Sequence, residues 1–267
     1  MNILCNIQKK YNIFSIKEKN LADYILHNCE DINNMNIKDL AKISGTSGAT
    51  ITRFCKKIDC ESFVDMKMKL NAIKPEIKVN KKENGILTDV YNYYKEVIER
   101  TKHLINSDNI YRFVNAIKNA NKIYIYGVGS SGLTATEMMQ RLLRMGLNVH
   151  SISDSHMMII NSAIVSPNDL VIGISISGET EEILQSLKIC KDKGANILSI
   201  TSFENSSITK YSHMNFIVYN TVFVDKENFI NSQFSTMYLL DLISMVLLKD
   251  EELSGKMKLT VDAIINN

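Results

Sequence analysis

KIYIYGVGSSG, residues 122–132, decides the architecture of the second half of this chain, because it has the pattern of a buried strand followed by a glycine-rich turn. Short β-branched runs recur in DLVIGISI, residues 169–176, and in NILSI, residues 196–200, and longer amphipathic runs separate them. Parallel strands are joined by crossover connections, which are usually helices. The alternation therefore predicts an α/β domain whose parallel sheet is covered by helices and which ends in one long helix.

The first half of the chain has a helical pattern instead. Ser15 and Glu18 have the spacing of a capping box, and they precede a run with apolar residues on one face. The segment KPEIKVNKKENG, residues 74–85, combines a proline with many charges and few large apolar residues, which indicates an exposed linker. We expect an all-α domain at residues 1–74, a linker at residues 75–87, and an α/β domain at residues 88–267 that includes two leading helices.

Composition indicates a cytoplasmic protein. The 267 residues are 45% hydrophobic, which is enough material for two cores. The five cysteines form no C-x-x-C pair, so we expect reduced thiols and no metal site. We expect neither a signal peptide nor a membrane span, because the most apolar late stretch, residues 238–248, is short and contains Asp241. The net charge is +2, and basic residues exceed acidic ones before Pro75, which is compatible with nucleic-acid binding.

The segment IKDLAKISGTSGATITRFCKK, residues 37–57, predicts two short helices joined by a tight turn. Gly45 can adopt the positive φ that the turn requires, and Ser47 can cap the second helix. Ala41, Gly45 and Ile51 follow one another at the spacing that lets the two helices of a helix-turn-helix pack closely. The pattern favours DNA binding, and a small helical bundle used for oligomerisation is the alternative.

The second helix of this segment is the one expected to enter the major groove. Its apolar Ile51 and Phe54 should face the core, so that hydroxyl and basic side chains project from its N-terminus and its other face. Hydroxyls can meet base edges or phosphates, arginine can bind guanine, and lysines attract phosphate oxygens. The candidate DNA-contacting residues are Ser47, Thr50, Thr52, Arg53, Lys56 and Lys57.

The loop GVGSSG, residues 127–132, follows a strand, opens a helix and satisfies the dinucleotide pattern G-x-G-x-x-G. Asp154 lies near the end of the next predicted strand, where an acidic residue can bind a ribose. An NAD(H)-sensing repressor is therefore one interpretation. The same loop places the hydroxyls of Ser130 and Ser131 at the start of a helix, where an anion is favoured.

A second loop, SISGET at residues 175–180, favours a phosphate ligand. It also follows a strand and opens a helix, and its candidate ligand-binding residues are Ser175, Ser177, Gly178 and Thr180. Hydroxyl donors at the positive end of a helix dipole suit a phosphomonoester, and the glycine allows close approach of the backbone. Together with the first loop, this one can line a single crevice at the C-terminal ends of the strands. The alternative is that the serines only cap their helices.

The order and spacing of these segments resemble the RpiR/MurR family of regulators, in which a helix-turn-helix precedes a sugar isomerase (SIS) domain. The matching segments are DLAKISGTSGATITRFCKK, IYIYGVGSSG, SDSH, DLVIGISISGET and GANILSITS, at residues 39–57, 123–132, 153–156, 169–180 and 194–202. The resemblance implies a flavodoxin-like, five-stranded parallel sheet and a phosphosugar bound by the loop residues named above. It also implies homodimers or homotetramers that bind a double-stranded DNA operator.

Three positions depart from the pattern of that family. Gln233 stands where many relatives have arginine, and Thr236 where many have glutamine, so the resemblance does not extend to the identity of the sugar. Asp59 lies in the turn after the recognition helix, where the commoner residue is glycine. Because aspartate tolerates left-handed φ better than most residues, we expect this turn to persist.

These observations predict a transcription regulator whose operator affinity is controlled by a phosphosugar, with no catalytic residue and no cofactor. The first alternative is an NAD(H)-sensing repressor that uses GVGSSG. A phosphosugar isomerase is a further alternative, and it needs a base and an acid beside the sugar. Glu137, His150, His156 and Glu179 are available for these roles, but no pairing among them is visible in the sequence.

Overall fold

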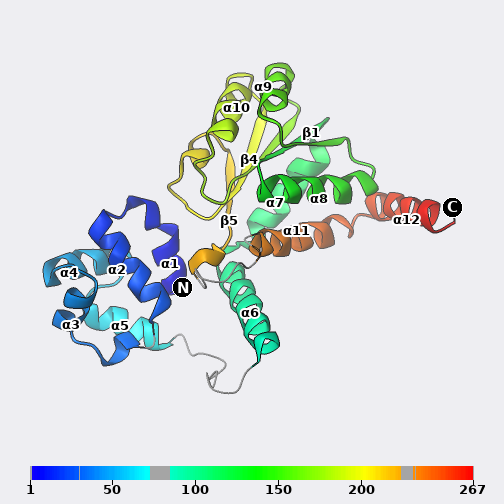
Figure 1. Cartoon of the computed structure of the whole chain (residues 1–267). Coiled ribbons are helices and arrows are strands. Elements are labelled where there is room, and N and C mark those ends of the chain that lie inside the picture. The colour runs from blue at the N-terminus through cyan, green and yellow to red at the C-terminus, as the bar shows by residue number, and fades with distance from the viewer. Residues whose placement is uncertain (1, 30, 73–84, 224–230, 232, 267) are drawn as a thin grey trace. The chain divides into compact units, whose positions relative to one another are not determined.

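The computed structural model describes residues 2–29, 31–72, 85–223, 231 and 233–266. Contacts divide the chain into two compact units, coloured along the sequence in Figure 1. The first unit comprises Met1–Leu104 and Tyr219–Ser232, and the second comprises Ile105–Val218 and Gln233–Asn267. Most of the predicted linker lies outside the described residues, so the predicted limits of the two domains stay a prediction.

The first unit is built from helices. Their bounds are α1 Ile3–Lys9, α2 Ile16–His27, α3 Ile37–Ile43, α4 Gly48–Lys57, α5 Phe63–Ala72 and α6 Ile86–Leu104, with 3-10 turns at Tyr11–Ile13, Asp31–Asn34 and Thr221–Phe223. The predicted capping box at the start of α2 is confirmed, since Ser15 Oγ accepts from the Glu18 N–H and the Glu18 carboxylate accepts from the Ser15 N–H. Asn36 and Asp39 form a second capping box that starts α3. Local capping therefore sets where these helices begin.

Helix α6 groups with the first unit by its contacts. One face of α6 is buried, and α6 contacts α1. This face carries Tyr93, Val97, Arg100 and Thr101. The pattern of α6 alone could not identify its partner, since an amphipathic helix specifies a buried face and not the surface that covers it.

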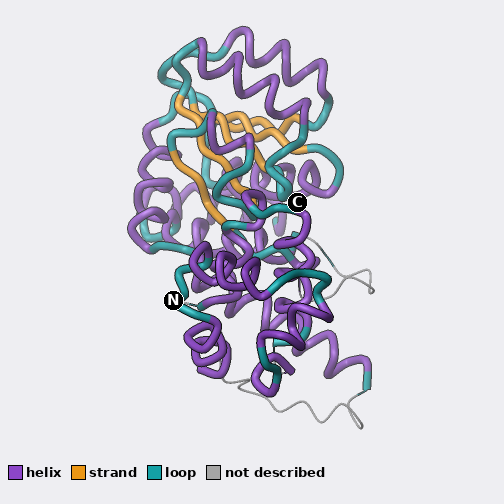
Figure 2. Tube along the Cα trace, turned by 90° about the vertical axis from the view of Figure 1, so that its left-hand side faces the viewer, coloured by secondary structure: helices purple, strands orange, loops and turns teal. Residues whose placement is uncertain are grey.

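The second unit contains a parallel sheet with strand order β2-β1-β3-β4-β5, which confirms the predicted flavodoxin-like fold. The strands are β1 Ile123–Gly127, β2 Val149–Ile152, β3 Leu170–Ile174, β4 Asn196–Thr201 and β5 Met214–Ile217. The helices of this unit are α7 Ser107–Asn119, α8 Ser130–Arg144, α9 Ser155–Ile164, α10 Glu181–Asp192, α11 Phe234–Leu247 and α12 Glu251–Ile265. The strands run side by side between helical layers in Figure 2.

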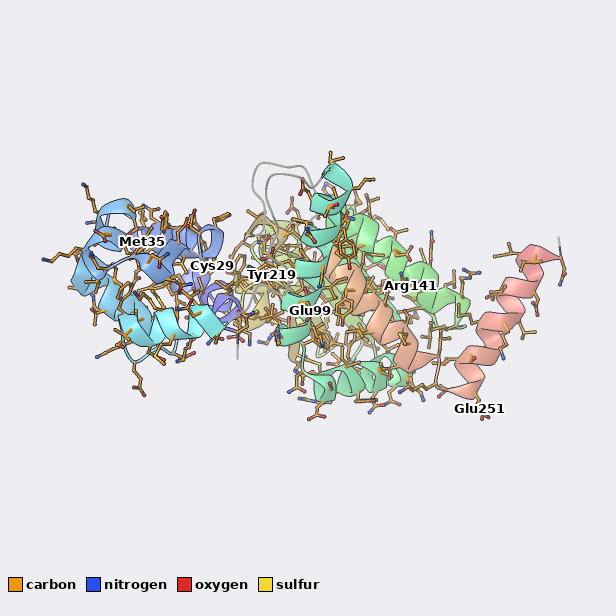
Figure 3. The ribbon with its side chains drawn as sticks, turned by 90° about the horizontal axis from the view of Figure 1, so that it is seen from below. Cys29, Met35, Glu99, Arg141, Tyr219 and Glu251 are labelled. Atoms are coloured by element: carbon orange, nitrogen blue, oxygen red, sulfur yellow. The ribbon has the colours of Figure 1, made fainter. Side chains whose placement is uncertain are left out.

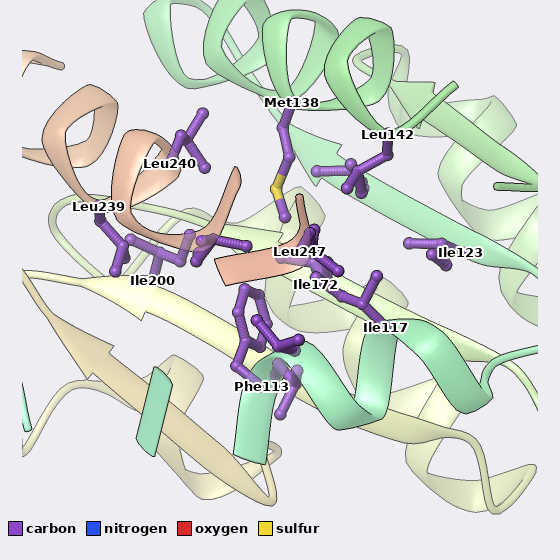
Figure 4. Close-up of a cluster of buried hydrophobic side chains, with 14 of the residues drawn as sticks. Phe113, Ile117, Ile123, Met138, Leu142, Ile172, Ile200, Leu239, Leu240 and Leu247 are labelled. Atoms are coloured by element: carbon purple, nitrogen blue, oxygen red, sulfur yellow. The ribbon is translucent and has the colours of Figure 1, made fainter. Parts of the chain in front are cut away.

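Alternation along β1 explains why both faces of the sheet are covered. Ile123 and Ile125 join one apolar cluster, with side chains of α7, α8 and α11, which Figure 4 shows in close-up. Tyr124 and Tyr126 join a second cluster, with side chains of α9 and α10. Each large apolar side chain that is fully buried contributes about 1.5–3 kcal/mol.

The C-terminal region departs from the single long helix that we expected. Helix α11 ends at Leu247, and the Asp250 carboxylate accepts hydrogen bonds from the N–H groups of Glu252 and Leu253. This side-chain cap starts α12 as a separate helix. Among the described residues, no helix is both long and apolar enough to cross a membrane.

Candidate DNA-binding and effector sites

The first candidate site is the helix-turn-helix formed by α3, the turn at residues 44–47 and α4. Gly45 adopts φ +64°, as the turn requires. The Thr46 N–H donates to the Ala41 carbonyl at 2.9 Å, and this bond closes the turn. Ser47 caps α4 by accepting from the Thr50 N–H at 3.2 Å. The structure therefore has the two helices and the turn that the sequence predicts.

Helix α4 has one buried and one exposed face. Ile51 and Phe54 are fully buried, and the Phe54 ring lies 4.9 Å from that of Phe14. Five of the predicted DNA-contacting residues are exposed: Ser47, Thr52, Arg53, Lys56 and Lys57. Thr50 is only 9% exposed, and its hydroxyl lies 2.9 Å from that of Ser47. The exposed face also includes Ala49, which lies three residues before Thr52 and which we did not predict.

Lys57 has a partner inside the first unit. Its ammonium donates to the Glu18 carboxylate at 2.8 Å, and the Glu18 side chain is only 6% exposed. Burial by itself would raise the pKa of the Glu18 carboxyl, but hydrogen bonds from Lys57 and Ser15 outweigh burial and lower this pKa. Lys57 thus ties α4 to α2, whereas Arg53 and Lys56 project from the exposed face.

The second candidate site lies where β1 and β3 end. These strands are neighbours, and Gly127 of β1 pairs in register with Ile174 of β3, so the two predicted loops leave the sheet side by side. The crossover that follows β1 leads to β2, which lies on the outer side of β1. The crossover that follows β3 leads to β4, on the opposite side of the β1–β3 pair. This is the topological switch point at which ligands bind in open α/β sheets.

The loop after β1 requires its glycines. A Cβ on Gly127 would lie 2.5 Å from the Ser131 carbonyl oxygen, and Gly129 adopts φ +58°. Ser130 begins α8 and is exposed, and Ser131 follows it with 9% exposure. The tight turn therefore brings two hydroxyl-bearing residues to the N-terminus of a long helix, where partial positive charge favours an anion.

The loop after β3 forms a compact cluster of hydroxyls. Ser175 Oγ lies 2.8 Å from Thr180 Oγ1 and 3.4 Å from Ser177 Oγ, and it accepts from the Gly178 N–H at 3.1 Å. Ser175 is 2% exposed, whereas Ser177 is exposed. The structure thus brings the four predicted residues of this loop together at the start of α10.

A third loop, at residues 202–207 after β4, supports the loop after β3 by hydrogen bonds. The sequence analysis did not predict this support. The Glu179 carboxylate accepts from the Ser207 N–H at 2.8 Å, and the Gly178 carbonyl accepts from the Ile208 N–H at 3.0 Å. Thr201 Oγ1 donates to the Ile176 carbonyl at 3.3 Å. The hydroxyl residues between Thr201 and Ser207 were the only sequence signal for this support.

The candidate acid and base residues are engaged elsewhere or stand apart. Glu179 makes the bond just described, and the Glu137 carboxylate accepts from Arg141 Nε at 2.7 Å. His150 stacks on Tyr124, with ring centroids 5.8 Å apart. His156 is exposed near the start of α9, where Asp154 caps the helix by accepting from the Met157 N–H. Within the described residues, no cluster of three or more His, Cys, Asp or Glu side chains is placed to hold a metal ion.

Gln233 and Thr236, the two departures at the start of α11, are both buried. Gln233 Oε1 accepts from Thr134 Oγ1 at 3.2 Å, and the same hydroxyl lies 3.2 Å from the Ser130 carbonyl oxygen. Within the described residues, Thr236 Oγ1 has no hydrogen-bond partner. Gln233 is therefore linked through Thr134 to Ser130, the first residue of α8.

Comparison with known proteins places both sites in a family. Residues 1–74 match the helix-turn-helix domain of the rpiR family, and residues 116–243 match the SIS domain. An uncharacterized HTH-type transcriptional regulator of Clostridium perfringens is 31% identical over 268 residues, which cover 94% of this chain and 94% of the relative. The chain belongs to the RpiR family of transcriptional regulators. A similar regulator of Caldanaerobacter subterraneus is 27% identical and covers 91% of this chain and 89% of the relative.

Two solved structures share the fold of this RpiR-family protein. The Vibrio vulnificus NanR protein, complexed with ManNAc-6P, has a TM-score of 0.62 and 24% identity, and the match covers 99% of this chain and 98% of NanR. The sugar isomerase domain of the RpiR transcription factor from Sphaerobacter thermophilus has a TM-score of 0.61 and 17% identity, and covers 67% of this chain and 99% of that domain. The predicted architecture is thus confirmed for both halves.

Proposed function

We propose that this RpiR-family regulator binds operator DNA through α4 and that a phosphosugar at the switch point of the SIS domain changes its operator affinity. The observation that carries the effector proposal is the pairing of Gly127 with Ile174, which puts two hydroxyl-bearing helix N-termini beside each other. Two such loops can share the negative charge of one phosphate group. The ManNAc-6P bound to NanR, which has the same fold, supports a phosphosugar as the ligand class.

The proposed effector site comprises Ser130, Ser131, Ser175, Ser177, Gly178 and Thr180. The proposed DNA contacts are Ser47, Thr52, Arg53, Lys56 and Lys57, with Thr50 positioning Ser47 through their shared hydroxyl contact. A homodimer or homotetramer in the cytoplasm would present paired α4 helices to two half-sites of an operator.

The two alternatives require side chains that are otherwise engaged. An isomerase needs an acid and a base at the sugar, and Glu137 and Glu179 already accept hydrogen bonds within the second unit. A dinucleotide site needs a carboxylate free to bind ribose, and the Asp154 carboxylate caps α9. We therefore propose regulation without turnover and without a nucleotide cofactor.

The effector proposal is tested by thermal unfolding with ManNAc-6P, glucose 6-phosphate, fructose 6-phosphate, inorganic phosphate and NADH. A ligand that prefers the folded protein raises the apparent stability, by about 2.7 kcal/mol at a concentration one hundred times its Kd. We expect a sugar phosphate to stabilise the protein and Ser175→Ala to abolish the effect. Ser186→Ala is the matched control, because Ser186 is buried in α10 and bonded only to its own helix at the Glu182 carbonyl.

The outcome also separates the alternatives. Stabilisation by NADH and by no sugar phosphate would favour the dinucleotide interpretation, and conversion of an aldose phosphate to a ketose phosphate would identify an isomerase. Operator duplexes selected from a random-sequence pool then report whether the stabilising sugar phosphate changes DNA affinity. Constant affinity across the panel would contradict the regulatory proposal.

A further inference from the structure

Helix α12 packs on the rest of its unit over its first half. Of its 15 residues, all of which the structure describes, Leu253 alone is buried, and it joins the apolar cluster with side chains of α7, α8 and α11. The Thr260 hydroxyl donates at 3.2 Å to the carbonyl of Arg144, the last residue of α8. In Figures 1 and 3 the helix then extends beyond α8 and α11, and Figure 3 labels Glu251 at its start. Residues 262–266 are all exposed, so the second half of α12 contributes little to the core of its unit.

The apolar face of α12 continues past the part that is buried. Leu253, Met257, Val261 and Ile264 follow one another at spacings of four, four and three residues, which places them on one face of the helix. These four residues are the α12 stripe. Met257 packs against the buried cluster, whereas Ile264 is 68% exposed and the adjacent Ile265 is 74% exposed. The stripe therefore begins in the core of the SIS unit and ends on an exposed surface.

Two observations indicate that this exposed surface is covered by a partner. A helix of about 12–15 residues is only marginally stable in water unless an apolar face packs against another surface. Beside the stripe, the buried Nε of Arg144 has no hydrogen-bond partner among the described residues, although the Arg144 carbonyl bonds Thr260. Burying a donor without an acceptor is unfavourable. The missing partner is therefore an apolar surface that also supplies an acceptor.

The charges next to the stripe favour a second copy of this chain as that partner. Residues 257–265 carry one positive side chain, Lys258, and one negative side chain, Asp262, and both are exposed. They lie four residues apart and are neighbours on the helix surface. In an antiparallel pair of α12 helices centred on Thr260, Lys258 of each copy lies opposite Asp262 of the other. A membrane surface suits this half of α12 less well, because helices that bind lipid are rich in Lys and Arg.

We propose that the α12 stripe packs antiparallel against the same stripe of a second copy, about a two-fold axis near Thr260. The identity of the occupant rests on the proposed function, because two half-sites of an operator require paired chains. The stripe itself is uncharged, so a self-complementary contact brings no like charges together along it. The axis also brings polar groups of the second copy close to Arg144, which lies at Thr260.

Sedimentation velocity of the full chain over a range of concentrations tests this proposal by measuring the dissociation constant of self-association. Ile264→Glu should raise this constant by more than about tenfold, because a two-fold contact buries the substituted side chain twice. Leu259→Glu is the matched control, since Leu259 is 70% exposed on the same helix but lies off the stripe. The control should stay within about twofold of the wild type.

An exchange of charges tests the antiparallel arrangement. Lys258→Glu places like charges opposite each other in both halves of the pair, and it should weaken self-association by about fivefold, because the two affected ion pairs are exposed. The double variant Lys258→Glu with Asp262→Lys restores both pairs. It should return the dissociation constant to within about twofold of the wild type. A double variant as weak as Lys258→Glu would overturn the antiparallel arrangement.

The remaining outcomes separate this inference from the proposed function. Equal dissociation constants for the wild type and Ile264→Glu would overturn the inference, and so would equal weakening by Ile264→Glu and Leu259→Glu. A wild type that stays monomeric at every concentration would overturn it as well. Failure of the proposed function has a different result: the chain would associate through α12, but no sugar phosphate of the panel would stabilise it or change its operator affinity.

Discussion

Gly178 lies so close to Ser206 that a Cβ on residue 178 would be 2.2 Å from Ser206 Oγ and 2.4 Å from its Cβ. Gly178 also adopts φ +70°, a backbone conformation that L side chains rarely adopt. The proposed effector loop after β3 therefore needs glycine for two independent reasons. The approach of Ser206 explains how the loop after β4 supports the cluster of hydroxyls around Ser175.

Gly178→Ala should distort the proposed effector loop and weaken the fold of the SIS unit. The added methyl group combines left-handed strain with overlap, and together these should lower the free energy of unfolding by about 2 kcal/mol or more. Stabilisation by sugar phosphates should disappear in the same variant. Urea unfolding with and without the sugar phosphate measures both effects.

Gly255→Ala is the matched control for this substitution. Gly255 lies within α12, and a Cβ there would meet nothing within 4 Å. Because glycine is unfavourable inside a helix, this change should raise the free energy of unfolding by about 0.5–1 kcal/mol and leave effector binding intact. Equal destabilisation by the two substitutions would contradict the assigned role of the Ser206 contact.

Arg53 and Lys57 should respond differently to substitution, although the sequence placed both on the DNA-contacting face. Arg53→Ala should weaken operator binding and leave stability unchanged, since Arg53 is exposed. A lost arginine contact to guanine costs about 1–3 kcal/mol of binding free energy. A lost phosphate contact instead lowers, by about 0.9, the magnitude of the slope of log affinity against log salt concentration. Arg112→Ala is the matched control, because it removes the same charge from an exposed position in the SIS unit. The salt dependence of binding to a selected duplex separates the two kinds of contact.

Lys57→Met should lower stability as well as operator affinity. The substitution leaves the Glu18 carboxylate without the ammonium that now lies 2.8 Å from it. Lys57 is 40% exposed, so solvent screens the pair and the expected loss in unfolding free energy is only about 1 kcal/mol. Full stability in Lys57→Met would show that the ion pair does not tie α4 to α2.

The same pair predicts a dependence of stability on pH. The Glu18 carboxyl has a lowered pKa in the folded protein, so its contribution is fully present above the ordinary pKa of glutamate. That contribution is lost as the pH falls through the lowered folded pKa. Lys57→Met should therefore reduce stability more at about pH 7 than at an acid pH below the lowered folded pKa, and urea unfolding at the two pH values measures the difference. An equal loss at both values would assign the effect to packing instead of charge.

Features set by neighbouring residues were predictable from the sequence, and features set by distant residues were not. The Ser15 capping box, the Gly45 turn and the two hydroxyl loops depend on residues a few positions apart, and all of them form as expected. The Lys57–Glu18 pair spans 39 positions and the Arg100–Tyr219 contact spans 119. No local pattern encodes such contacts, because tertiary packing chooses the partner.

At Asp59 the sequence departs from the family pattern, and the tolerance of aspartate for left-handed φ predicted that the turn would persist. Asp59 adopts φ +62°, which confirms that the turn persists. The Cys60 N–H donates to the Cys55 carbonyl at 2.8 Å, and the Asp59 N–H donates to the Lys56 carbonyl at 3.3 Å. This pattern of bonds is a Schellman motif, which normally uses glycine at the left-handed position.

Asp59→Gly should therefore leave stability within about 1 kcal/mol of the wild type. Glycine removes left-handed strain of about 1–2 kcal/mol. It also removes an exposed ion pair with Lys10 at 2.8 Å, which contributes at most about 1 kcal/mol. Asp59→Val should instead destabilise by more than about 2 kcal/mol, because it loses the ion pair and places a β-branched side chain at positive φ. Asp59→Asn keeps the tolerance for left-handed φ and isolates the ion pair, so urea unfolding should rank it between the other two variants.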